Sequence, residues 1–176
     1  GLPLIVHATG LREAKVALEA GANLLVHSVW DRAVDADFLR LAKKNGAIYC
    51  PTLTVVDGYQ RMVESAANGT PPAIDDPHHG VDSLTVANVA STPVEGVGRV
   101  DPKRLGDPAA SAARRRVMEK NLLAVHRAGI PIAMGTDGGN PLTPHGPSVY
   151  AEMEAMQRAG MPAASASARA TPPVGS

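Results

Sequence analysis

The amino-acid sequence predicts an α/β fold in which short parallel strands alternate with helices. The first observation is a recurring pattern, in which a short apolar run is followed by a segment whose apolar residues recur at helical spacing. The second is that three of these runs end at a polar side chain, at His7, His27 and Asp137. A helix between two strands returns the chain to the same end of a sheet, so these strands should pair in parallel.

Composition limits the kind of protein. With 176 residues, 44% of them hydrophobic, the chain can bury one domain core. Seventeen basic and seventeen acidic residues cancel, and aromatic residues make up only 3% of the chain, so neither a nucleic acid nor a membrane is an expected partner. No apolar run approaches the roughly 18 residues that span a bilayer. We therefore expect a soluble protein, with the cytoplasm as its default compartment, that binds a small molecule.

The first half of the chain contains two consecutive strand and helix units that lead into a third strand. We expect strands over residues 2–8, 23–27 and 47–52, and helices over 11–20 and 35–45. Gly21 and Gly46 follow the two helices, at the position where glycine commonly ends a helix.

The second half resumes the alternation after a long irregular segment. A helix over 56–67 is followed by residues 68–108, which are rich in Pro, Gly, Asp and Ser and which we interpret as a long loop or lid. Beyond this segment we expect a helix over 109–128, a strand over 131–136, a helix over 147–159 and a weak helix over 163–170.

The polar residues that end the strands suggest a metal site. Carboxyl ends of parallel strands face the same edge, so His7, His27 and Asp137 should converge, and two imidazoles with a carboxylate suit a divalent ion such as Zn, Fe, Mn or Ni. Each residue also has another interpretation. A strand-end histidine can be structural or contact substrate, and Asp137, before Gly138 and Gly139, can form a turn or precede a phosphate-binding loop.

Five short motifs stand at or shortly after these strand ends: Val6-His7-Ala8, Leu25-Val26-His27-Ser28, Ala133-Met134-Gly135-Thr136-Asp137-Gly138, His145-Gly146 and Glu152-Met153-Glu154. Together they resemble the amidohydrolase superfamily, and most closely its imidazolonepropionase-like branch, which includes prolidase-like enzymes. The resemblance covers nearly the whole chain. It implies that residues 1–176 form the C-terminal half of a (β/α)8 barrel of the TIM type, comprising strands five to eight with their helices.

The resemblance also implies a role for each residue. His7 resembles the metal ligand on strand five, and His27 resembles the strand-six histidine, which binds a second metal or contacts the substrate. Asp137 resembles the strand-eight aspartate, a metal ligand that takes a proton from metal-activated water. His145 resembles a substrate-binding histidine. The implied cofactor is a divalent metal ion, with zinc as the expected metal, present as one or two ions.

Two features of that family are missing from the chain, namely the His-x-His pair of strand one and the lysine of strand four. His78 and His79 are adjacent, so their side chains diverge on a strand and do not replace the pair. A full barrel takes roughly 250 residues, so we interpret the chain as a half barrel. Its open sheet edges predict a homo-oligomer or a missing N-terminal half, and the start at Gly1, directly before a strand, favours truncation.

The sequence therefore predicts a metal-dependent hydrolase of C–N bonds in amides, peptides or cyclic amides, acting through metal-activated water. The alternative is a catalytically incomplete half-barrel fragment or interaction module without tight metal binding. A third possibility is a phosphate-binding barrel that uses Gly138 and Gly139. Of the other reactive side chains, we expect Cys50 to be a buried structural thiol and the arginines at 114–116 to face solvent.

Overall fold

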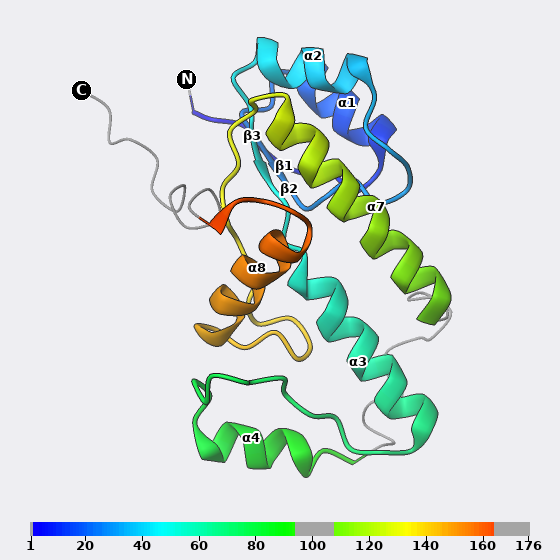
Figure 1. The fold of residues 1–176 in the computed structure, drawn as a ribbon, viewed down its shortest axis with the longest axis vertical. Helices are drawn as coiled ribbons and strands as arrows, with labels where there is room; N and C mark the ends of the chain where they lie inside the picture. The colour runs from blue at the N-terminus through cyan, green and yellow to red at the C-terminus, as the bar shows by residue number, and fades with distance from the viewer. Residues whose placement is uncertain (1, 94–107, 164–176) are drawn as a thin grey trace, which may run out of the picture. The chain divides into compact units, whose positions relative to one another are not determined.

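The computed structural model describes residues 2–93 and 108–163, and it contains the expected alternation of strands and helices (Figure 1). Three strands, β1 (Ile5–His7), β2 (Leu24–Val26) and β3 (Ile48–Cys50), form one sheet in the order β1-β2-β3. Both pairings are parallel. The expected α/β class with parallel strands is confirmed, and in the described part of the chain the sheet is open.

Two helices connect these strands, α1 (Leu11–Glu19) from β1 to β2 and α2 (Ala36–Lys44) from β2 to β3. The carboxylate of Asp35 caps α2 by accepting a hydrogen bond of 2.9 Å from a backbone N–H of the first turn. Gly21 and Gly46 end the two helices with φ of 93° and 58°, the left-handed conformation that glycine adopts without steric cost. The local signals therefore predicted these two helices correctly.

The fourth predicted strand, over 131–136, is reduced to a single bridge. Ile132 pairs in parallel with Tyr49 of β3, with flanking backbone hydrogen bonds of 2.9 and 3.0 Å. Further along, Gly135 passes so close to β3 that a Cβ on it would lie 2.6 Å from the sulfur of Cys50. The prediction of four strands is thus wrong in extent, because one bridge does not continue into the regular ladder of a strand.

Three further helices match the sequence-based expectation to within two residues, namely α3 (Thr54–Asn68), α7 (Pro108–Arg127) and α8 (Pro147–Arg158). No helix in the part of the chain that the structure describes is long and apolar enough to cross a membrane. The weak helix expected over 163–170 lies, apart from its first residue, outside the described residues.

The interpretation of residues 68–108 as irregular is wrong in part, because α4 (Ser83–Ala90) lies within this segment. The Asp82 carboxylate caps α4 by accepting a hydrogen bond of 2.9 Å from the N–H of Thr85. None of the α4 residues is buried. A helix without a buried face has no need of apolar residues at helical spacing, which is the pattern that predicts the other helices. Residues 94–107, the rest of the expected lid, lie outside the described residues.

The chain divides into two compact units. We call the first the sheet unit; it comprises Gly1–Leu53, Arg114–Gly135 and the segment from Glu152 onward. The second, the loop unit, comprises Thr54–Ala113 and Thr136–Ala151. His7 and His27 therefore belong to the sheet unit, whereas Asp137 and His145 belong to the loop unit, and each unit is described by itself.

The core of the sheet unit is built around two aromatic rings. Phe38 of α2 and Tyr49 of β3 pack edge to face, with their ring centroids 6.3 Å apart. The Tyr49 hydroxyl accepts a hydrogen bond of 3.1 Å from the N–H of Val29. Burial raises the pKa of Tyr49 to about 12, so the phenol stays neutral. Other large side chains that are fully buried in this unit are Leu18, Leu25, Leu53, Met118, Leu122, Val125 and Met156.

Asn121 on α7 attaches the loop after β2 to this core. Its side chain is buried, and its amide nitrogen donates to the carbonyl oxygens of Val29 and Arg32 at 2.8 and 3.0 Å. Its amide oxygen accepts from the N–H of Val34 at 2.9 Å. One side chain thus satisfies three backbone groups of the segment that follows His27.

We predict that Asn121→Leu, which keeps the size of the side chain, destabilises the protein by about 2–4 kcal/mol. The physical reason is that it leaves three backbone groups without their partner. Urea unfolding followed by circular dichroism measures the effect. The matched control is Lys120→Ala at the exposed neighbouring position, with an expected change within about 0.5 kcal/mol. Equal losses in the two variants would contradict the assigned role of Asn121.

Candidate functional site

Two imidazoles meet at the carboxyl ends of β1 and β2. His7 is the last residue of β1, and His27 directly follows β2 with φ of 75°. The N–H of His27 donates to the carbonyl oxygen of Cys50 at 2.9 Å, which continues the parallel pairing one step beyond the strands. The two rings lie edge to face with centroids 4.5 Å apart. The sheet therefore brings together the two histidines that the sequence singled out.

A threonine at the end of the next strand fixes one nitrogen of the second ring. Nδ1 of His27 lies 2.7 Å from Oγ1 of Thr52, within hydrogen-bond distance. Thr52 is 2% exposed and has φ of 46°, a left-handed conformation that is rare for a β-branched residue. Thr52 therefore fixes the position of Nδ1 of His27 at the edge of the sheet.

The residue after Thr52 is held by two charged side chains from distant parts of the sequence. The N–H of Leu53 donates to Oε1 of Glu152 at 2.8 Å, and its carbonyl oxygen accepts from Arg115 at 3.0 Å. Glu152 is fully buried. Arg115 also pairs with Glu119 on the next turn of α7 at 3.0 Å. Both backbone groups of Leu53 are thus satisfied by charged partners, which fixes the bend at Thr52.

In the loop unit, the residues after Asp137 form a compact turn. Asp137 has φ of 53°, and its carbonyl oxygen accepts from Nδ2 of Asn140 at 2.9 Å. The hydroxyl of Tyr59 on α3 donates to Oδ1 of Asn140 at 2.8 Å. The turn therefore depends on Asn140, and Tyr59 supports it.

The glycines of this turn make room for the ring of His145. A Cβ on Gly138 would lie 2.9 Å from Nδ1 of His145, and one on Gly139 would lie 3.2 Å from Nε2. The N–H of Gly139 donates to the carbonyl oxygen of Thr143 at 2.9 Å, so it is not available to an anion. These contacts argue against a phosphate-binding loop at Gly138 and Gly139, and they explain the glycines by close packing of His145.

The donor set fits a divalent metal ion in part. The two strand-end imidazoles are nitrogen ligands of the kind that zinc takes. Among the residues that the structure describes, no group of three or more His, Cys, Asp or Glu side chains is arranged to hold a metal ion. A metal site that used His7 and His27 would therefore need at least one further ligand.

Comparison with known proteins supports the fold. No family model matches the chain, and none of the curated proteins does. Among solved structures, a Xaa-Pro dipeptidase with methionine bound in its active site is similar, with a TM-score of 0.58 and 21% sequence identity. The match covers 97% of this chain and 32% of the dipeptidase.

The chain therefore has a fold similar to one part of that dipeptidase. This likeness concerns the fold alone, and it agrees with the α/β fold that the motifs predicted. Because the chain spans about a third of the dipeptidase's length, the likeness accounts for a partial barrel and leaves the activity to be argued from the site.

Three residues that support the histidines were not recognised in the sequence. Thr52 ends an apolar run as His7 and His27 do. Its position at the end of a predicted strand could therefore have identified it as a site residue. Arg115 was expected to face solvent with its neighbours, and that expectation is wrong, because Arg115 bonds to Leu53 and the guanidinium of Arg114 lies 5.8 Å from the Trp30 ring. No sequence signal indicates the partner of Glu152.

The remaining reactive residues are two histidines of the loop unit and one cysteine of the sheet unit. His78 and His79 are exposed in a turn of the loop unit, where the His78 ring is 5.5 Å from the ring of Tyr150. Cys50, expected to be buried, is half-buried at the end of β3.

We predict that Gly138→Ala destabilises the loop unit by about 1–2 kcal/mol because the new methyl group displaces the ring of His145. The measurement is a double-mutant cycle by urea unfolding, in which the same substitution is made in a His145→Ala background. There the cost of Gly138→Ala should fall by about 1 kcal/mol. A cost that is the same in both backgrounds would show that the glycine serves another purpose.

Proposed function

We propose that this chain is part of a metal-dependent hydrolase that cleaves C–N bonds of amides, peptides or cyclic amides. The observation that carries the proposal is the pair of imidazoles, 4.5 Å apart at the carboxyl ends of β1 and β2, on a fold shared with a dipeptidase. Carboxyl ends of parallel strands are where barrel enzymes of this class place their active sites. Xaa-Pro dipeptides are the substrates we would test first, since the structurally similar protein is a Xaa-Pro dipeptidase.

In this proposal each residue has a defined task. His7 and His27 would hold the metal ion, which would supply Lewis acidity at the substrate carbonyl and a lowered pKa for water. The carboxylate of Asp137 accepts a proton from water and passes it to the leaving amine. His145 orients the substrate. Asp137 would also be a metal ligand in this proposal, and any further ligands would come from a part of the longer enzyme outside this chain.

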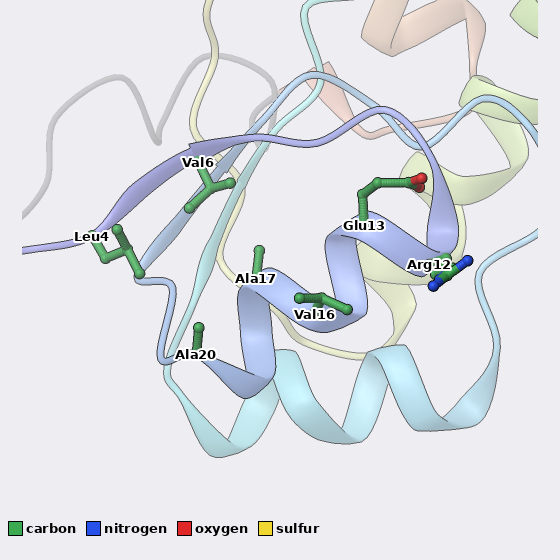
Figure 2. Close-up of a pocket in the computed structure, with 7 residues that line it drawn as sticks. All are labelled: Leu4, Val6, Arg12, Glu13, Val16, Ala17 and Ala20. Carbon is green, nitrogen blue, oxygen red and sulfur yellow. The ribbon is translucent and has the colours of Figure 1, made fainter.

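An open edge of the sheet supports the need for those further parts. β1 is an edge strand, and Ile5 and Leu4 remain 59% and 42% exposed. Between β1 and α1 lies a hollow of about 500 Å³, and Figure 2 shows its lining. The residues that line it are Leu4, Val6, Arg12, Glu13, Val16, Ala17 and Ala20. A strand paired with β1 and the helix attached to it would cover this apolar surface.

The same surface favours a second candidate function, a non-catalytic interaction module. In that case the open edge of β1 and the hollow beside α1 would bind another protein, and His7 and His27 would be structural. Metal analysis separates the two functions. The hydrolase predicts a divalent ion bound in the full-length gene product and lost on His7→Ala or His27→Ala, and the module predicts no tightly held ion.

We predict that Asp137→Asn lowers kcat at least about 100-fold with little change in KM, because the amide cannot accept the proton. The measurement is hydrolysis of a panel of Xaa-Pro dipeptides and cyclic amides by the full-length gene product supplied with Zn²⁺.

The matched control is Asp37→Asn on α2, which removes an exposed carboxylate that pairs with Lys15 and Arg40. Its kcat should stay within about twofold of the unaltered protein, because a surface ion pair contributes little to stability. Near-normal turnover in Asp137→Asn would exclude Asp137 as the proton-transfer group.

A further inference from the structure

The outer edge of β1 pairs with no strand in the part of the chain that the structure describes. On the inner edge, the carbonyl oxygen of Leu4 accepts from the N–H of Leu24 at 3.2 Å, and the N–H of Ala8 donates to β2 at 3.3 Å. Successive residues of a strand direct their N–H and C=O groups to opposite edges. The backbone groups of Ile5 and His7 therefore face the outer edge.

The hollow of about 500 Å³ between β1 and α1 is continuous with this edge. Leu4 and Val6 line it from the strand, whereas Val16, Ala17 and Ala20 line it from α1 (Figure 2). Val16 is 57% exposed, so an apolar side chain of the helix also lacks a covering group among the described residues. A partner that fits this surface supplies a strand for the edge and an apolar helix for the hollow.

We propose that the partner is a second copy of this chain, paired antiparallel through β1 about a two-fold axis at Val6. The second copy supplies both the strand and the helix attached to it. About this axis Ile5 lies opposite His7 of the other copy, and the two symmetric pairs form four backbone hydrogen bonds. The pairing ends at Pro3, which has no N–H to donate.

The charges on α1 favour the antiparallel arrangement. A two-fold axis perpendicular to the sheet keeps both copies of α1 on one face, side by side and in opposite directions. Arg12 and Glu19 are exposed and lie one turn to either side of Val16, so Arg12 of each copy comes beside Glu19 of the other. The carboxylate of Glu13 is turned toward Gly10, where it fills the space that a Cβ would take, and so it is directed to the start of its own helix.

This inference goes beyond the proposed function and does not rest on it, since the association needs neither a metal ion nor a substrate. It does affect the pair of imidazoles. His7 supplies half of the backbone groups in the new pairing, so the second copy holds the strand end that carries the His7 ring.

The first test is the molar mass of the 176-residue chain, measured by sedimentation equilibrium from about 1 to 100 µM. We expect a particle of twice 18.2 kDa, the mass of one chain. Val16→Lys, which places a charge in the hollow, should weaken the association at least about 100-fold. The matched control is Leu84→Lys on α4, an exposed leucine of the loop unit, which should leave the association unchanged. A chain that stays monomeric over this range overturns the proposal.

Two further substitutions test the pairing itself. Ile5→Pro removes an N–H of the outer edge and keeps the bonds to β2, so it should weaken the association about tenfold or more without changing the circular dichroism. In a Cys50→Ser background, Val6→Cys lies on the axis and should form a disulfide between the two copies. Leu4→Cys should not, because its two copies are separated by more than the roughly 7 Å that a disulfide spans.

Charge reversal tests whether the partner is a second copy in this orientation. Arg12→Glu should weaken the association about tenfold, and adding Glu19→Arg to the same chain should restore it. A dimer that is insensitive to both Val16→Lys and Ile5→Pro would overturn the proposal, because the copies would then meet at another surface. A disulfide through Leu4→Cys and none through Val6→Cys would overturn it as well, since the register would be different.

Discussion

The parallel pairing of β1, β2 and β3 is the constraint on which the rest of the structure depends. In their register His7 lies opposite Val26, and Val26 lies opposite Cys50. Each strand therefore ends at the same edge, and the next polar residues of the chain meet there. The two imidazoles come into contact, and the hydroxyl of Thr52 reaches the second one, because of this register.

Beneath this edge, buried polar side chains from the later helices hold the loops that follow the strands. Asn121 on α7 fixes the loop after β2, while Glu152 on α8 fixes the bend after β3. Both are buried and both are hydrogen-bonded to backbone groups, so their desolvation is compensated. The sheet unit thus has an apolar core for stability and a layer of polar contacts that determines where the strand-end side chains lie.

The fold comparison and the site support different levels of conclusion. Likeness to a Xaa-Pro dipeptidase concerns the fold, and the chain covers 32% of that protein. Chemistry depends on the side chains at the strand ends, since one fold can serve many reactions. In this chain two imidazoles, those of His7 and His27, meet at the strand ends, and this pair is the reason why a hydrolase is the function we propose.

The sequence by itself determined the α/β class, the positions of most helices and the polar residues at the strand ends, because hydrophobic spacing and helix-ending glycines are local signals. It missed α4, which buries no residue, and it overestimated the strand at 131–136. Only the tertiary structure decided which groups meet at His27. Thr52 is 25 residues away from it, and Glu152 is 99 residues from its partner Leu53. Contacts of that separation form through packing of whole elements, and no local pattern encodes them.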